Sequence, residues 1–344
     1  MHTGGMTSRA DITAAHARIA GDIRHTPLLR LDNGWCLKLE SLQRGGSFKV
    51  RGAFNRLRRA GDLSAGVVAA SGGNHGVAVA LAARVLGARA DIFVPEVSSP
   101  AKQARILAEG ARLVVGGARY ADALAASQAH AASTGAIQVH AYDHPDVLAG
   151  QGTVALEWQQ DAPELTHVLV AVGGGGLIGG MAAWYAGSAA IIAIEPASSP
   201  ALHAALAAGR PVDVEVGGVA ADSLGARQVG GLMFPIVAAH VAQSVLVADE
   251  AIIAAQRWLW AECQVVSEPG GATALAALLS GAWVPPPGAR VGVLVCGGNC
   301  APGSVAPGSV APGSIVPASV ALGADNLGAG IPGAGDPGAH GARG

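Results

Sequence analysis

Three lysines stand among the 22 basic residues of this 344-residue chain, and one of them, Lys49, has neighbours that suit covalent chemistry. It follows a glycine pair and an aromatic ring in the segment Gly45-Gly46-Ser47-Phe48-Lys49. A lysine amine condenses with an aldehyde to form a Schiff base, and surroundings of low dielectric lower its pKa into a useful range. The turn would hold the amine rigidly, and Phe48 would place it near a flat ring. The alternative is a solvated base at the start of a helix.

A second segment, Ser71-Gly72-Gly73-Asn74-His75-Gly76, stands between an expected strand and an expected helix. Small residues at a helix N-terminus leave backbone N–H groups free to bind an anion. The Asn74 amide can also donate to a phenolic or carboxylate oxygen. The alternative is an N-capped turn in which His75 is an ordinary helix-start residue.

Four consecutive glycines, Gly173 to Gly176, precede Leu177 and follow the apolar run THVLVAV. Glycines allow a close backbone approach, and the N-terminus of the following helix favours negative charge, so the loop predicts a phosphate cradle. The same loop holds Gly174-x-Gly176-x-x-Gly179, and Glu195 stands 19 residues after Gly176. That pattern also matches the dinucleotide fingerprint, so a nicotinamide-dependent oxidoreductase is an alternative.

Two further motifs lie in the last third of the chain. Cys296-Gly297-Gly298-Asn299 ends an expected strand, where a buried free thiol followed by a turn is the simplest interpretation. The segment Ser267-Glu268-Pro269-Gly270-Gly271-Ala272 is interpreted as a helix cap with an acid at the positive helix end.

Together these segments resemble the pyridoxal-phosphate (PLP) dependent serine/threonine dehydratases, which are ammonia-lyases of the tryptophan-synthase-β-like fold, PLP fold type II. The similarity runs from about Thr26 to Asn299. It rests on six motifs in the same order: SFKVRGAFN, SGGNH, AGQGT, VGGGGL, EPGGA and CGGN. The resemblance implies an α/β fold with two open twisted domains, mostly parallel sheets and the cofactor in the cleft between them.

The resemblance also implies a role for each matching residue. Lys49 would hold PLP as a Schiff base and later remove the proton at Cα, and Asn74 would bond the 3′ oxygen of the ring. Cys296 would face the pyridine nitrogen. The implied cofactor-binding residues are Phe48, Lys49, Asn74, Gly173, Gly174, Gly175, Gly176, Leu177 and Cys296. The implied substrate-binding residues are Ser71, Gly72, Gly73, Asn74 and His75.

The expected reaction is the β-elimination of a β-hydroxy L-amino acid, L-threonine or L-serine above all, to a 2-oxo acid and ammonia. A neutral thiol at the pyridine nitrogen makes the ring a weaker electron sink, which favours loss of the β-hydroxyl over a long-lived carbanion. Related racemases carry a second serine where this chain has Gly72, so racemisation is disfavoured. Some relatives bind a cation near the position of Glu195, but Ala201 replaces a second acid, and no metal is expected. A non-catalytic amino-acid-binding relative is a third alternative, against which Lys49 argues.

Alternating strands and helices must position these motifs. Between residues 66 and 141, apolar runs of strand length alternate with helical segments, which predicts crossover units and a parallel sheet. A second α/β stretch begins near residue 141. We therefore expect a discontinuous large PLP-binding domain from 1–40 plus 141–300 and a small α/β domain over 41–140. Residues 301–344, with their repeated APGSV, predict a disordered Ala/Pro/Gly/Ser-rich tail.

Composition excludes several other classes. A net charge of −2 with 13% charged residues offers no basic surface for nucleic acid or for an anionic membrane. The uncharged run from Leu165 to Ile194 is long enough to span a bilayer, but its glycines favour strand, loop, helix and strand instead. Four cysteines without a C-x-x-C pair and an N-terminus without an apolar leader predict a cytoplasmic protein. The resemblance alone implies a homodimer.

Overall fold

A computed structural model describes residues 6–305 of the chain. These residues fall within one compact unit, Met1–Gly308. Apart from residues 301–305, the predicted disordered tail lies outside the described residues.

The larger of two sheets has six strands in the order β1-β2-β10-β7-β8-β9. Neighbouring strands pair in parallel, except that β1 runs antiparallel to β2. The strands are β1 (Leu28–Arg30), β2 (Cys36–Leu39), β7 (His167–Ala171), β8 (Ala190–Pro196), β9 (Val241–Val247) and β10 (Val291–Val295). Every residue of the central strand β10 is buried. Burial on both faces explains why the sequence shows continuous apolar runs here and no polar alternation.

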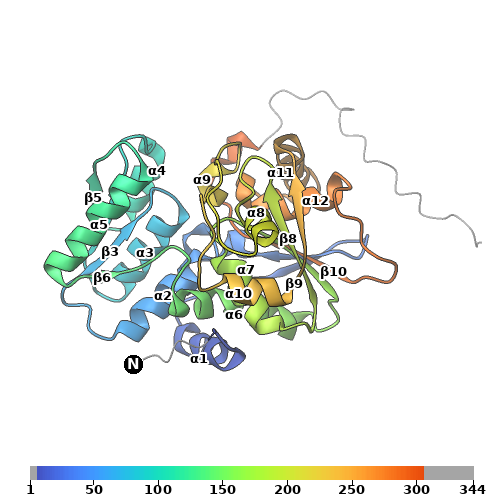
Figure 1. Cartoon of the computed structure of the whole chain (residues 1–344), viewed down its shortest axis with the longest axis horizontal. Coiled ribbons are helices and arrows are strands. Elements are labelled where there is room, and N and C mark those ends of the chain that lie inside the picture. The colour runs from blue at the N-terminus through green and yellow to red at the C-terminus, as the bar shows by residue number, and fades with distance from the viewer. Residues whose placement is uncertain (1–5, 306–344) are drawn as a thin grey trace, which may run out of the picture. The chain divides into compact units, whose positions relative to one another are not determined.

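The smaller sheet has four parallel strands in the order β5-β4-β3-β6. Its strands are β3 (Val67–Ala70), β4 (Ala90–Val94), β5 (Arg112–Val115) and β6 (Ile137–Gln138), and its helices are α3 (Asn74–Val85), α4 (Pro100–Ala108) and α5 (Tyr120–Thr134). Figure 1 shows this sheet and its helices as a group of elements apart from the larger sheet. The two mostly parallel α/β layers confirm the predicted fold class.

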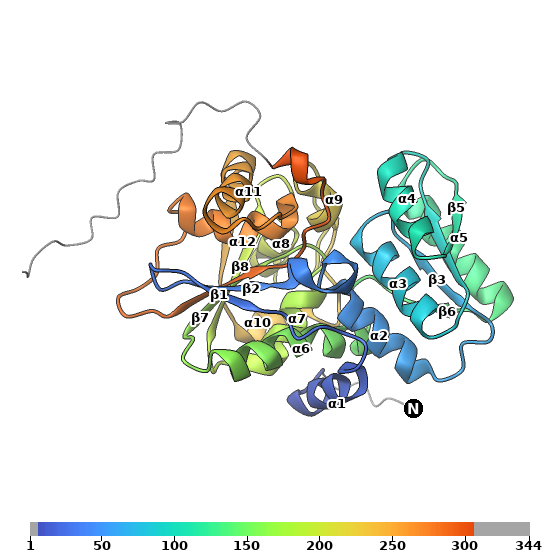
Figure 2. The ribbon, with the colours of Figure 1, turned by 180° about the vertical axis from the view of Figure 1, so that it is seen from behind.

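Helix α2 (Lys49–Ala60) packs its buried apolar side chains with those of the smaller sheet and α3. The remaining helices lie around the larger sheet, as both ribbon views show (Figure 2). They are α1 (Arg9–Ile19), α6 (Pro145–Asp161), α7 (Gly176–Tyr185), α8 (Ala201–Ala208), α9 (Ala221–Leu224), α10 (Phe234–His240), α11 (Asp249–Cys263) and α12 (Pro269–Leu279), with short 3-10 helices η1 (Glu40–Leu42), η2 (Arg44–Gly46) and η3 (Pro302–Ser304). The largest cluster of buried apolar side chains lies between these helices and the sheet.

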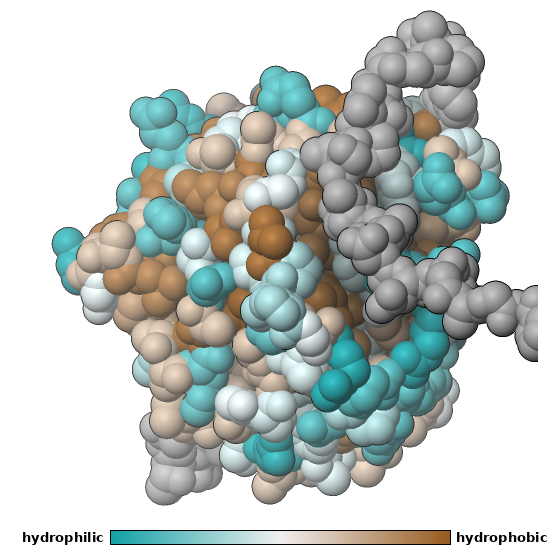
Figure 3. All heavy atoms as spheres, turned by 90° about the vertical axis from the view of Figure 1, so that its right-hand side faces the viewer, coloured by the Kyte–Doolittle hydropathy of each residue, from teal (hydrophilic) through white to brown (hydrophobic). Residues whose placement is uncertain are grey.

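The uncharged run from Leu165 to Ile194 forms β7, the glycine loop, α7 and the first part of β8, as the glycines predicted. Among the described residues, no helix has the length and apolarity that crossing a membrane would need. The low charge content also shows at the surface. On the face drawn in Figure 3, apolar side chains form a broad area between scattered polar ones.

Candidate active site

Lys49 is the first residue of α2 and follows a turn that requires glycine. Gly45 and Gly46 have φ angles of 69° and 74°, in the left-handed region that side chains other than glycine avoid. The Lys49 Nζ donates to the carbonyl oxygen of Ala141 at 3.0 Å and lies 5.1 Å from the centre of the Phe48 ring. Burial lowers the pKa of the Lys49 amine to about 8. A share of the amine is therefore unprotonated and nucleophilic near neutral pH.

Arg51 anchors the start of α2, two residues after Lys49. Its guanidinium is fully buried and donates to the Glu40 carboxylate at 2.7 and 2.8 Å and to the Glu157 carboxylate at 2.7 and 2.8 Å. Burial by itself raises the pKa of Glu157, but the hydrogen bonds and charge of Arg51 bring it below the usual value. Glu40 belongs to η1 and Glu157 to α6. The paired charges thus fix the helix that carries Lys49 to two neighbouring elements.

A cavity brings together every cofactor-binding residue that the sequence predicted. Lys49 and Phe48 reach it from the start of α2, and Asn74 reaches it from the smaller sheet's helix α3. Gly173, Gly174 and Gly175 come from the β7–α7 loop, Gly176 and Leu177 begin α7, and Cys296 follows β10. Its lining residues include Phe48, Lys49, Asn74, Gly173, Gly174, Gly175, Gly176, Leu177 and Cys296.

The glycine loop presents free backbone donors to this cavity. Gly175 caps α7 with a φ of 88°, and among the described residues nothing accepts hydrogen bonds from the N–H groups of Gly176 and Leu177. A Cβ at Gly174 would lie 2.3 Å from the Tyr142 ring, so a side chain would not fit beside it. Unpaired N–H groups at the positive end of a helix bind an anionic oxygen well.

Cys296 is a neutral thiol that lines the same cavity. It is 4% exposed, and burial raises the pKa of its thiol far above the usual range. The Sγ donates to the carbonyl oxygen of Gly270 at 3.4 Å. The group that the sequence places opposite a pyridine nitrogen is therefore uncharged at physiological pH.

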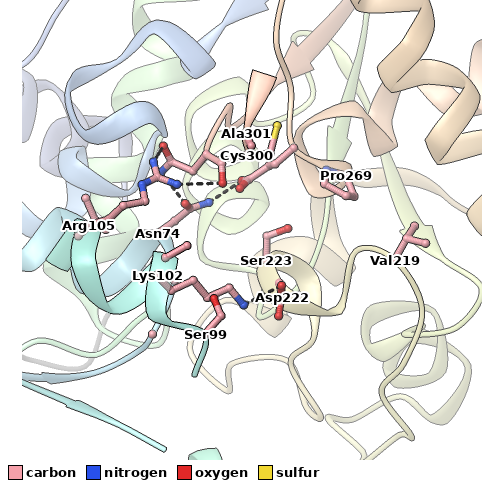
Figure 4. A pocket seen from close by; sticks show the side chains of 16 residues that line it. Asn74, Ser99, Lys102, Arg105, Val219, Asp222, Ser223, Pro269, Cys300 and Ala301 are labelled. Atoms are coloured by element: carbon pink, nitrogen blue, oxygen red, sulfur yellow. Dashed lines mark hydrogen bonds and ion pairs between the residues drawn. The ribbon is translucent and has the colours of Figure 1, made fainter. Parts of the chain in front are cut away.

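A larger cavity of about 650 Å³ adjoins the first and shares Asn74, Ser223 and Glu268 with it. Gly72, Gly73 and Asn74 line it at the N-terminus of α3. Figure 4 shows Lys102 and Asp222 pointing toward one another, with the ammonium 2.7 Å from the carboxylate. This second cavity has the free helix N-terminus that a substrate carboxylate needs.

Two of the predicted substrate-binding side chains do not line either cavity. The Ser71 hydroxyl accepts a hydrogen bond from the backbone N–H of Gly73 at 3.2 Å. The His75 ring is buried and its Nε2 donates to the carbonyl oxygen of Val139 at 2.9 Å. Burial lowers the pKa of His75 to about 3, so the ring is neutral. Only the backbone groups of these two residues, and not their side chains, remain available for the predicted substrate binding.

Three residues at the site had no role in cofactor or substrate binding assigned from the sequence, although Glu268 was interpreted as the acid of a helix cap and is the N-cap of α12. Tyr142 and Glu268 line the cofactor cavity, and Asn299 lines the larger one. Glu268 is 7% exposed, and burial raises the pKa of its carboxyl to about 7. Glu268 belongs to the EPGGA motif and Asn299 to the CGGN motif. Both contact residues that are far away in the sequence, so no local pattern reveals these contacts.

The dinucleotide alternative lacks its acid. Both Glu195 carboxylate oxygens accept hydrogen bonds from the first turn of α8, from Leu202 N–H and His203 N–H at 2.7 Å each. Glu195 therefore caps a helix and is not available for a ribose hydroxyl. Within residues 6–305, no group of three or more His, Cys, Asp or Glu side chains is arranged to hold a metal ion.

Comparison with known proteins identifies relatives of the whole site. Residues 19–297 match the family model described as "Pyridoxal-phosphate dependent enzyme". The chain is 37% identical over 268 residues to the L-threonine ammonia-lyase of Thermotoga maritima, covering 76% of this chain and 66% of that relative's length. The match therefore spans just under two thirds of that relative.

The fold of this chain also resembles those of solved structures. Maize serine racemase has a TM-score of 0.83 and 32% identity, with 88% of this chain and 96% of that chain covered. The threonine deaminase of T.th. has a TM-score of 0.80 and 35% identity, with 86% of this chain and 99% of that chain covered. The neighbours confirm the predicted PLP fold type II, and the matching family model confirms the predicted cofactor. The chain belongs to the family of pyridoxal-phosphate dependent enzymes.

Proposed function

We propose that the protein is a PLP-dependent ammonia-lyase that dehydrates and deaminates a β-hydroxy L-amino acid, L-threonine or L-serine first among them. The observation that carries this proposal is the cavity in which Lys49, Cys296 and the start of α7 meet. The relatives named as threonine ammonia-lyase and threonine deaminase support it.

The donor set of the cavity fits PLP group by group. The Lys49 amine suits an aldehyde, and the unpaired N–H groups of Gly176 and Leu177 suit a phosphate. The Asn74 amide can donate to a phenolic oxygen, and the neutral thiol of Cys296 suits an unprotonated pyridine nitrogen. When bound, PLP supplies an electron-withdrawing ring that acidifies the Cα of the amino acid and allows its β-hydroxyl to leave.

The protein's own groups would then bind the substrate and remove its Cα proton. The N–H groups of Asn74 and His75 at the start of α3 bind the substrate carboxylate and orient Cα toward Lys49. The Lys49 amine takes the Cα proton, because burial leaves it partly unprotonated near neutral pH.

Elimination is proposed over racemisation because one face of Cα lacks a second base. Gly72 carries no side chain, and a Cβ at this position would lie 2.7 Å from the Ser98 Oγ. A serine at position 72 would fit only if Ser98 moved. The maize serine racemase is nevertheless a close structural neighbour, so D-serine formation is the second activity to assay.

The test is a panel of β-hydroxy amino acids given to the PLP-loaded protein. L-threonine, L-serine, 3-hydroxyaspartate and β-phenylserine all suit the chemistry, and oxo-acid and ammonia release identifies the preferred one. Lys49→Arg keeps the positive charge but not the nucleophilic amine, so we expect it to abolish turnover and the borohydride-stable pyridoxyl adduct. Far-ultraviolet circular dichroism would check that this variant folds. An active Lys49→Arg enzyme, or a loaded wild type that releases no oxo acid from the panel, would contradict the proposal.

The oligomeric state, the localisation and the domain bounds stay predictions. We propose that the protein is a homodimer, that it is cytoplasmic, and that its two domains divide at residues 40 and 140. The grouping of β3, β4, β5 and β6 into a separate sheet supports that division.

A further inference from the structure

Four polar side chains form one continuous hydrogen-bonded row beside the cofactor cavity. The Arg105 guanidinium donates to the side-chain and backbone oxygens of Asn299, the latter at 2.9 Å. The Asn299 Nδ2 donates to the Asn74 Oδ1 at 2.6 Å, and the Asn74 Nδ2 donates to the Glu268 Oε1 at 2.5 Å. We call these four residues the amide relay. Figure 4 shows Arg105 and Asn74 at one side of the larger cavity.

The relay has a fixed direction because of its Arg105 end. A guanidinium can only donate. Arg105 therefore requires the Asn299 oxygen on its side, and the carbonyl oxygen of Gly45 requires the Asn299 Nδ2 on the other, at 2.8 Å. Asn299 must then donate to the oxygen of Asn74, and this leaves the Asn74 nitrogen facing Glu268.

The direction matters for the face that Asn74 turns to the cofactor cavity. One of the two Asn74 Nδ2 hydrogens goes to Glu268, and among the described residues no acceptor takes the other. A Cβ at Gly297, next to Cys296, would lie 3.4 Å from this nitrogen and 2.2 Å from the Glu268 Oε1. The Asn74 nitrogen therefore lies above the end of β10, beside the cofactor cavity. If the Asn74 amide were reversed, its nitrogen would face the Asn299 Nδ2, and two hydrogen-bond donors would meet.

We propose that Asn299 and Glu268 are positioning residues that together hold the Asn74 amide with its nitrogen toward the ring oxygen of PLP. The proposal rests on the proposed function for the identity of the ring and deepens it by naming residues that the motifs left unassigned. The relay also joins the two sheets: Arg105 and Asn74 belong to α4 and α3, whereas Asn299 and Glu268 follow β10 and precede α12.

Asn299 and Glu268 bond to Asn74 from opposite sides, through different atoms of its amide. A double-mutant cycle between Asn299 and Glu268 therefore measures how strongly the two residues are coupled through Asn74. The proteins are the PLP-loaded wild type, Asn299→Ala, Glu268→Ala and the double variant, each also made with Asn74→Ala. The measurement is the ratio of the two absorption bands of bound PLP, which reports the proton at the ring oxygen, together with the PLP dissociation constant. Asn33→Ala and Glu262→Ala, at exposed positions, are the matched controls.

We expect each single variant to change the band ratio by about tenfold, the loss attached to one hydrogen bond to a charged or buried partner. The double variant should depart from the product of the single effects by about threefold or more. With Asn74→Ala, neither change should move the ratio further. If Asn299→Ala does not fold, Arg105→Ala removes both donors to Asn299 and should shift the ratio in the same direction, again only when Asn74 is present.

The outcomes separate the relay from the proposed function. The relay would be overturned, and the proposed function left standing, by either of two results. In PLP-loaded proteins, the effect of the double variant on the band ratio could equal the product of the single effects. The shifts in the band ratio could also persist with Asn74→Ala. A wild type that binds PLP but releases no oxo acid would overturn the proposed function and leave the relay to be judged on the band ratio. A wild type that binds no PLP would overturn both.

Discussion

Replacing Arg51 by methionine should be the most damaging single change near the site that leaves Lys49 itself intact. Methionine keeps a flexible apolar stem but removes a fully buried cation. In its absence Glu157 keeps the Lys38 ammonium at 3.3 Å. Glu40, which is also fully buried, keeps only the Thr26 hydroxyl at 2.6 Å among its described side-chain partners. Glu40 is therefore the group that the substitution leaves as an uncompensated charge.

The size of the loss follows from that stranded carboxylate. Removing one partner of a buried ion pair costs about 3–5 kcal/mol, against a total stability of roughly 5–15 kcal/mol for a folded protein. We therefore expect Arg51→Met to lower the free energy of unfolding by about 4 kcal/mol. Adding Glu40→Gln removes the stranded charge and should recover about 2 kcal/mol, because the remaining amide can still bond Thr26. The start of α2 then loosens, and kcat should fall even where the variant is folded.

Urea unfolding followed by tryptophan fluorescence measures this prediction, with PLP removed from every protein because a bound ligand shifts stability. Arg30→Met is the matched control. It breaks the Arg30–Glu164 pair, whose side chains are 57% and 39% exposed, and should lower the free energy of unfolding far less than Arg51→Met does. The reasoning is refuted if Arg51→Met costs no more than Arg30→Met, or if Glu40→Gln worsens the Arg51→Met variant.

Three further outcomes follow from the cavity walls. Gly174→Ala would place a Cβ 2.3 Å from an aromatic ring and should weaken PLP binding about tenfold in a fluorescence titration, whereas Gly21→Ala, with nothing within 4 Å, should not. Because burial lowers the Lys49 pKa to about 8, PLP incorporation into the apoprotein should speed up as pH rises through about 8; a midpoint near 10 would contradict the burial argument. Gly72→Ser combined with Ser98→Gly should yield measurable D-serine from L-serine by chiral chromatography, whereas wild type should yield little; no gain in the double variant would argue against the missing-base explanation.

The sequence predicted the parallel strands well because burial on both faces leaves a clear signal. Val67–Ala70 is an unbroken apolar run, Ala90–Val94 is apolar apart from Asp91, and Gly87 follows the helix between them. Strand β9 gives no such signal. Its residues Val241–Val247 are mostly half-buried or exposed and include Gln243 and Ser244. It forms because it pairs with β8 along the sheet edge, a contact that no local pattern records.

Helix α6 escaped prediction for a different reason. It contains Gly150 and Gly152, which lower helix propensity. A Cβ at Gly150 would lie 2.6 Å from the Arg51 carbonyl oxygen, and one at Gly152 would lie 2.8 Å from that of Gly180. The glycines thus let α6 approach α2 and α7 closely, so packing outweighs propensity. The same holds for the amide relay, because Asn74 and Glu268 stand 194 residues apart.

The three lysines show why scarcity alone could not identify the reactive one. Lys38 is the most buried, yet its ammonium bonds the Thr26 carbonyl oxygen and lies 3.3 and 3.4 Å from two carboxylates. The Lys102 ammonium lies 2.7 Å from Asp222. Lys49 bonds a single backbone carbonyl and faces the cavity. A carboxylate partner holds the proton on an amine, whereas desolvation without one releases it. Chemistry at Lys49 therefore depends as much on the absence of a bonded carboxylate as on the motif around it.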